Sequence, residues 1–245
     1  ELDELDNGFT EMGVLVSHTV QKAVAAFINH DREAAQQIIA EDHQINDREI
    51  DLESKSFEMI ALYQPVTTDL REVVTILKAV SDLERAGDHA RNIAHATIEV
   101  KGQHRSPEVE SQLATMGEQT TEIVKQAIQA YVNKDEQAAR DLVAINNQLA
   151  AINERLLREV YNQAQADSNV ILAAMKYSAV AADLLRIADY MNNVGEWIVY
   201  LKTGHIVELK LMHNNDYTGD NTLHKTPNRF FGESTCNPQQ RVRPN

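Results

Sequence analysis

Two carboxylates, Glu84 and Asp88, lie four residues apart in the segment 81–95. On an α-helix, residues i and i+4 lie on the same side, so both carboxylates can reach one point in space. Two carboxylates this close repel each other unless a proton or a cation joins them. A hard or borderline divalent cation such as Mg²⁺, Mn²⁺, Fe²⁺ or Zn²⁺ suits these oxygen ligands, so the pair is a candidate metal site.

The alternative interpretation is a solvated acidic edge whose carboxylates pair with arginines, because many helices carry such a spacing. The segment, however, returns at 182–196, about a hundred residues later. At an offset of 101 the two copies share five residues: Asp82/Asp183, Leu83/Leu184, Arg85/Arg186, Asp88/Asp189 and Asn92/Asn193. The repeat indicates an internal duplication and strengthens the functional interpretation of Asp88 and Asp189.

The two copies are unequal, because Leu185 stands where the first copy has Glu84. A second carboxylate pair could be rebuilt from Asp189 and Glu196, which stands at the position of His95. The candidate metal ligands are therefore Glu84, Asp88 and Asp189, with Glu196 and His95 as weaker candidates. Arg85 and Arg186 are candidates either for structural ion pairs or for contacts with a partner or an anion.

The elements that position these residues are predicted to be long helices. Apolar residues recur at three- and four-residue steps over 9–30, from 32 to about 62, and from 67 or 68 to about 98. Asp31 is a predicted cap of the second helix, and Thr67 or Thr68 of the third, which follows Pro65. The second half repeats this order at 108–132, 135–164 and 168–202, with its turn at 133–135 echoing 29–31 at an offset of 104.

Three long helices joined by short loops must run antiparallel, so each half is predicted to be an up-down-up bundle. The predicted fold is all-α, with two tandem, pseudo-symmetric three-helix bundles and six helices. The expected domains are 1–100 and 108–204, joined by a linker at 101–107 and followed by an irregular tail at 205–245. The stretch 171–180 is apolar nearly all round, so we expect it to be covered by more than its own two partner helices, at the seam between the halves.

Composition narrows the functional classes. A net charge of −14 argues against nonspecific nucleic-acid binding. The single cysteine, Cys236, excludes an internal disulfide, and no stretch of about 18 apolar residues predicts a membrane span, so we expect a cytoplasmic protein. The sequence holds no P-loop, no Gly-x-Ser-x-Gly and no Glu-x-x-His, and it predicts no enzyme.

The segment DLERAGDHARNIA at 82–94 closely resembles the hallmark of the PhoU family, and DLLRIADYMNNVGEWIVYLKTG at 183–204 looks like its second copy. The resemblance covers about residues 8–210. It implies six helices in two bundles and a cytoplasmic homodimer, located peripherally at the membrane through its partners. It also implies negative regulation of phosphate uptake and of the phosphate-starvation response, through the ATPase subunit of a phosphate ABC transporter and a sensor histidine kinase.

Some family members bind multinuclear iron or zinc clusters through an E/D-x-x-x-D motif, and others are linked to Mg or Mn. Carried over by position, the resemblance implies Glu84 and Asp88 as ligands in the first copy and Asp189 in the second. Two alternatives remain: a metal-free helical adaptor of the same fold, and a carboxylate-bridged, oxygen-activating metalloenzyme, which the missing Glu-x-x-His disfavours.

Overall fold

The computed structural model describes residues 1–100 and 105–209. Most of the predicted linker and tail, including Cys236, lies outside these residues, and the predicted domain boundaries stay a prediction. All regular elements in the described part are helical: α1 (Leu2–Ile28), α2 (Arg32–Glu41), α3 (His43–Glu58), η1 (Met59–Tyr63), α4 (Thr67–Glu99), α5 (Pro107–Val132), α6 (Glu136–Ala166), η2 (Ser168–Val170) and α7 (Ile171–Thr203).

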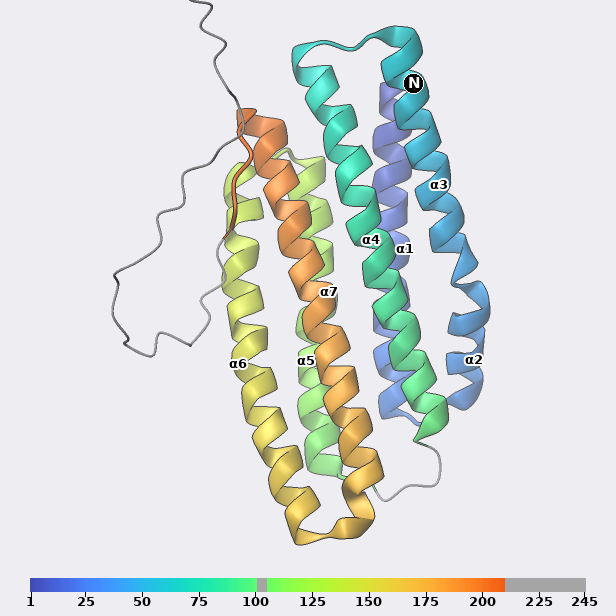
Figure 1. Ribbon diagram of the computed structural model, residues 1–245, viewed down its shortest axis with the longest axis vertical. Coiled ribbons are helices and arrows are strands. Elements are labelled where there is room, and N and C mark those ends of the chain that lie inside the picture. Colours follow the sequence, from blue (N-terminus) through green and yellow to red (C-terminus); the bar gives the residue numbers. More distant parts are fainter. Residues whose placement is uncertain (101–104, 210–245) are drawn as a thin grey trace, which may run out of the picture. The chain divides into compact units, whose positions relative to one another are not determined.

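The predicted fold class is confirmed. In the first bundle, α2 and α3 together take the place of one long helix between α1 and α4, and the second bundle consists of α5, α6 and α7 (Figure 1). The bundles pack through two helix pairs, α1 with α5 and α4 with α7. None of the helices in the described part is long and apolar enough to cross a membrane.

The turn that follows the first helix is the same in both bundles. His30 and Lys134 adopt left-handed backbone conformations, with φ of 60° and 49°. The next residue in each case, Asp31 or Asp135, caps the following helix by accepting a hydrogen bond from a backbone amide three residues on, at 2.9 and 3.1 Å. The capping prediction is therefore confirmed, and the duplicated sequence produces a duplicated turn.

The second helix of the first bundle differs from its prediction. Instead of one helix from 32 to about 62, the chain breaks at Asp42, between α2 and α3, and then passes through the π turn η1. The predicted threonine caps are wrong: the cap residue of α4 is Val66, which has no side-chain oxygen to offer. Thr67 already lies in the first turn, with φ of 48°.

The α1–α5 contact depends on two equivalent glycines. A Cβ atom at Gly13 would lie 2.1 Å from Cδ1 of Ile128, and one at Gly117 would lie 2.4 Å from Cγ1 of Val24. Gly13 and Gly117 are related by the offset of 104, and so are Val24 and Ile128. The crossing is thus pseudo-symmetric, and the absent side chains let the two backbones approach closely.

The stretch 171–180 contacts more than its two partner helices in the second bundle. The ring of Tyr177 packs against Phe27 of α1, with 6.1 Å between the ring centroids, and Lys176 pairs with Glu99 of α4. Ala173, Tyr177 and Val180 are buried, but Leu172 and Met175 are 57% and 63% exposed, so one side of the stretch stays uncovered. The stretch lies at the end of the second bundle, beside the α6–α7 turn (Figure 1).

Candidate functional site

Glu84 and Asp88 lie on α4, on the side that faces α3. Burial raises the pKa of Glu84 to about 7, and the nearby charges of Asp88, Glu49 and Asp42 add to this effect. Four carboxylates from α4 and the α2–α3 segment therefore crowd one region of the first bundle. We call these four residues, Asp42, Glu49, Glu84 and Asp88, the acidic site.

Two local features place the α3 side of the acidic site. Gly87 lets α3 come close to α4, because a Cβ atom there would lie 2.7 Å from Cδ1 of Ile45. The break in the helix leaves Asp42 at the junction of α2 and α3, with its side chain only 11% exposed. The hydroxyl of Ser81 donates to Glu49 at 2.9 Å.

Arg91 supplies part of the balancing charge. Its guanidinium forms ion pairs with Asp42 at 2.5 Å and with Asp88 at 2.9 Å, so one cation joins two of the four carboxylates. Arg85 lowers the pKa of Glu84 by less than burial and the neighbouring carboxylates raise it. Among the described residues, neither Glu84 nor Glu49 forms an ion pair, so two of the four carboxylates lack a directly bound cation.

The donor set of the acidic site fits a hard divalent cation, because it consists of carboxylate oxygens and has an excess of negative charge. The side chains are not gathered around one point: in residues 1–100 and 105–209, no group of three or more His, Cys, Asp or Glu side chains is arranged to hold a metal ion. His95, the weaker candidate on the same helix, is exposed and lies apart from any partner within the described residues.

The second bundle has a different donor set at the equivalent positions. At an offset of 104, Asp42 and Glu49 correspond to Asn146 and Asn153, and at 101 Glu84 and Asp88 correspond to Leu185 and Asp189. We call Asn146, Asn153, Leu185 and Asp189 the amide site. Asp189 accepts a hydrogen bond from Nδ2 of the buried Asn146 at 3.0 Å. One carboxylate among amides and a leucine does not fit a multinuclear metal cluster.

Glu196 takes another role. Its carboxylate accepts a hydrogen bond from the backbone N–H of Leu209 at 2.7 Å and so fastens the segment after α7 to the bundle. Burial raises the pKa of Glu196, and this hydrogen bond lowers it by less. Nothing in the described part joins Glu196 to Asp189.

The remaining repeated residues hold α4 against α7. Asn193 donates to Asp82 at 3.1 Å, and the His89 ring nitrogen Nδ1 lies 2.7 Å from a carboxylate oxygen of Asp183. Asp82 and Asp183 are not among the site residues predicted from the sequence, so their role in holding α4 against α7 was missed. The repeat was the available signal, because residues that recur at a pseudo-symmetric seam contact each other's helices.

The two arginines that recur in the motif differ in their contacts. Arg186 lies 3.5 Å from Asp189 in an exposed i,i+3 ion pair. Arg85 lies over the ring of Tyr190, with 5.9 Å between its Cζ atom and the ring centroid, which is within the range of a cation–π interaction. Arg186 thus pairs within its own helix and Arg85 reaches across to α7, and their contacts with a partner or an anion stay a prediction.

Comparison with known proteins identifies the family of this fold. A family model described as the PhoU domain matches residues 9–97 and again residues 113–198. The chain belongs to the PhoU family. The two matched regions correspond to the two bundles.

Individual PhoU proteins resemble this chain in sequence and in structure. A phosphate-specific transport system accessory protein PhoU homolog from Streptococcus pneumoniae is 34% identical over 209 residues, which are 85% of this chain and 96% of that protein. Its counterpart from Pseudomonas aeruginosa is 30% identical over 204 residues, 83% of this chain and 84% of that protein. The crystal structure of the phosphate transport system regulatory protein PhoU from S. pneumoniae superposes with a TM-score of 0.80, at 33% identity, over 85% of this chain and 98% of that chain.

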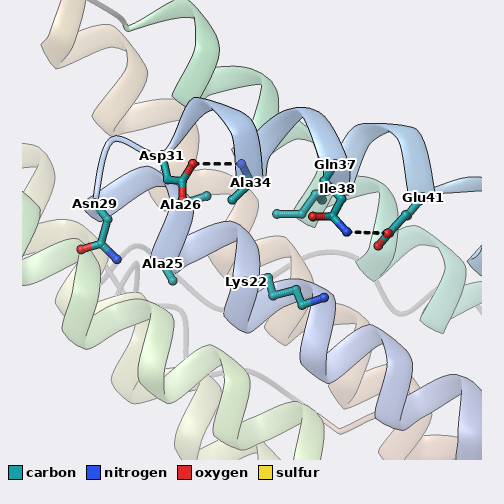
Figure 2. Close-up of a pocket in the computed structure, with 9 residues that line it drawn as sticks. All are labelled: Lys22, Ala25, Ala26, Asn29, Asp31, Ala34, Gln37, Ile38 and Glu41. Atoms are coloured by element: carbon teal, nitrogen blue, oxygen red, sulfur yellow. Dashed lines mark hydrogen bonds between the residues drawn. The ribbon is translucent and has the colours of Figure 1, made fainter.

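Two surface hollows of this PhoU chain are alternative candidate ligand sites. One, of about 210 Å³, lies between the end of α1 and α2, where Asp31 caps α2 and Gln37 donates to Glu41 (Figure 2). The other is a mostly apolar groove of about 1010 Å³ between α1 and α5. The carboxylates of the first hollow are already hydrogen-bonded, and the charged pair of the second, Glu11 and Arg48, neutralises itself at 2.9 Å. The acidic site remains the better candidate.

Proposed function

We propose that this chain is a non-enzymatic negative regulator of phosphate uptake and of the phosphate-starvation response. It acts by contact with the ATPase subunit of a phosphate ABC transporter and with a sensor histidine kinase, as a homodimer at the cytoplasmic side of the membrane. Membership of the PhoU family carries the proposal, because the relatives are named accessory and regulatory proteins of phosphate transport.

Deletion of the gene tests the regulatory role. Phosphate-starvation genes should be derepressed in phosphate-rich medium, and a plasmid copy should restore repression. Normal repression in the deletion strain would reject the regulatory assignment. Pull-down of the transporter's ATPase subunit by the purified chain tests the direct contact separately.

The acidic site is the proposed metal-dependent part of this function. Glu84 and Asp88 would hold a divalent cation such as Mg²⁺ or Mn²⁺, or one ion of an iron or zinc cluster, with Asp42 and Glu49 facing them from α3. A bound cation would supply positive charge at a site where Arg91 forms ion pairs with only two of the four carboxylates. The raised pKa of Glu84 supports this proposal, because burial and the neighbouring carboxylates both make its charged form unfavourable without a cation.

Metal analysis of protein purified without a chelator tests the site. The double variant Glu84→Gln, Asp88→Asn should lose most of its bound metal, whereas Asp189→Asn in the amide site should retain it. Equal metal contents in all three proteins would place any bound metal elsewhere.

One observation favours a second candidate, the metal-free adaptor. Arg91 already joins Asp42 and Asp88 and so neutralises part of the charge that a bound metal ion would neutralise. If this candidate is correct, the deletion phenotype persists but chelator-treated protein binds the ATPase subunit as well as untreated protein does.

A further inference from the structure

The turn between α3 and α4 exposes four large apolar side chains. Phe57, Leu62, Tyr63 and Val66 are 59%, 67%, 58% and 71% exposed, all within ten residues. We call these four residues the apolar tip. Single exposed apolar residues are ordinary, but a group that includes two aromatic rings is typical of a protein-contact surface.

The backbone of the apolar tip is irregular in a way that the fold does not require. The π turn η1 is followed by Gln64 and Thr67, whose φ values of 47° and 48° are unfavourable for residues other than glycine. Such conformations are strained for residues other than glycine and cluster at binding sites. The α6–α7 turn makes the same reversal through a short 3₁₀ turn capped by Asp167, without a positive φ.

The charges around the apolar tip are mostly negative. Glu58 and Asp69 are exposed on either side of it, and neither forms an ion pair with another described residue. Glu4 lies with Glu58 beside Tyr63. Of the neighbouring cations, Lys55 pairs with Asp51 at 2.7 Å, whereas Arg71, whose guanidinium lies beside Gly204, has no ion pair among the described residues. The free charge beside the exposed apolar side chains is therefore mainly carboxylate.

We propose that the apolar tip docks a basic amphipathic helix of a partner protein. The apolar face of that helix would cover Leu62 and Val66, and its Lys or Arg side chains would reach Glu58 and Asp69. The carboxylates disfavour an anionic lipid surface as the occupant. The inference rests on the proposed function only in requiring a protein partner.

The opposite end of the molecule offers a matched control (Figure 1). The α6–α7 turn exposes Tyr161, Leu172 and Met175 at 62%, 57% and 63%, so its apolar exposure is similar. Its surroundings, however, carry charges of both signs, including the ion pairs of Arg158 with Glu154 and of Lys176 with Glu99. A purely hydrophobic effect would act at both ends, whereas the proposed docking acts only at the apolar tip.

The test uses the full chain and a fluorescein-labelled Leu/Lys amphipathic helix of about 18 residues, long enough for five turns. A Leu/Glu helix of the same pattern is the charge control. By fluorescence anisotropy, the parent should bind the Leu/Lys helix and not the Leu/Glu helix. The variant Leu62→Ser, Val66→Ser should weaken this binding by about tenfold or more, and the control Leu172→Ser, Met175→Ser should not. Glu58→Lys, which leaves the apolar side chains in place, should also weaken it.

Several results would overturn the inference: no binding of the Leu/Lys helix by the parent, equal binding of both helices, or equal binding by the two serine variants. Binding to phosphatidylglycerol vesicles that depends on the apolar tip, in place of helix binding, would make it a lipid site instead. Pull-down of the transporter's ATPase subunit separates this inference from the proposed function. If the parent and the apolar-tip variant capture that subunit equally, the docking inference fails while the proposed function stands. If the parent captures none, the proposed ATPase contact fails, and the helix measurements alone decide the inference.

Discussion

In the first bundle, α3 and α4 bring four carboxylates together, whereas the equivalent positions of the second bundle hold two amides, a leucine and one carboxylate. Around these positions the two bundles match: the left-handed turn, the aspartate cap and the glycine crossing all occur twice. The shared features are those that hold helices together. The difference lies at the positions that could bind a charged ligand. Both halves have therefore retained the scaffold, but only the first half has the four carboxylates.

The amide site also shows how a bundle can do without a cation. Asn146 satisfies Asp189 by donating a hydrogen bond, whereas Asp42 and Glu49 in the acidic site can only accept. With three neutral residues and one carboxylate, the amide site lacks the carboxylate repulsion that adds to the effect of burial on the pKa of Glu84. The comparison therefore predicts that charge, and not the fold, decides which bundle holds metal.

The largest expected effect comes from rebuilding the second site. The triple variant Asn146→Asp, Asn153→Glu, Leu185→Glu gives the second bundle the four carboxylates of the first. If carboxylates on this scaffold are sufficient, isothermal titration with Mn²⁺ should show an additional binding site in the variant. Unchanged stoichiometry in a variant with native circular dichroism would mean that the scaffolds differ in more than charge.

Substitution at the glycine crossing should affect both bundles alike. Gly13→Ala and Gly117→Ala each place a Cβ atom within 2.4 Å of a side chain of the facing helix. Overpacking costs about 1–3 kcal/mol, partly offset by the better helix propensity of alanine, about 1 kcal/mol. Urea denaturation should therefore show a loss of free energy of unfolding of similar size in both variants. A loss in only one would break the pseudo-symmetry of the scaffold.

The pH dependence of stability should report on a buried cluster that joins the bundles. Glu72 of α4 is buried and pairs with Lys134, next to Asp6 of α1, which accepts a hydrogen bond from Tyr131. Burial raises the pKa of Glu72, the Lys134 hydrogen bond lowers it by less, and Asp6 adds to the rise. A raised carboxyl pKa contributes stability at low pH that is lost as the pH rises through the folded-state value.

Glu72→Gln removes that ionisation. Relative to the parent, the free energy of unfolding of this variant should therefore increase as the pH rises from below the ordinary glutamate pKa through the raised pKa of Glu72. Urea denaturation at a series of pH values measures the difference. Glu118→Gln, an exposed change on α5, is the control and should follow the parent. A pH-independent difference for Glu72→Gln would reject the pKa direction.

The smallest effect is expected at the α4–α7 seam. Asn193→Ala removes the hydrogen bond to Asp82, and His89→Ala removes the contact with Asp183. Each should cost about 1 kcal/mol, with a further penalty for the carboxylate left without its partner. Because the two pairs lie apart on the seam, thermal denaturation of the double variant should show nearly additive losses. Strong coupling would indicate that the seam behaves as one unit.

Much of the scaffold could be predicted from the sequence because its signals are local. The caps at Asp31 and Asp135 and the apolar periodicity act within one turn of the helix, and the motif copies at 81–95 and 182–196 revealed the pseudo-symmetry. The break at Asp42 carries neither glycine nor proline, so no local rule indicates it. The conformation of Thr67 depends on the packing of the whole turn.

The acidic site could be predicted only in part. Glu84 and Asp88 share a helix face, so their spacing was informative. Asp42 and Glu49 join them only because α3 packs against α4 over Gly87, which is a tertiary contact. The amide site could have been predicted from the sequence. The offset of 104, already visible at the turns, makes Asn146 and Asn153 equivalent to Asp42 and Glu49.

The irregular backbone of the apolar tip also records how the two halves diverged. The offset between the repeats is 104 before this turn and 101 after it, so the first half is three residues longer at this one connection. The three additional residues form part of a turn that contains a π turn and two residues with left-handed backbone conformations; they do not lengthen a helix. The change in length after duplication thus falls where the first half turns its aromatic side chains outward, and trimming this turn by three residues should give the first half the hairpin of the second.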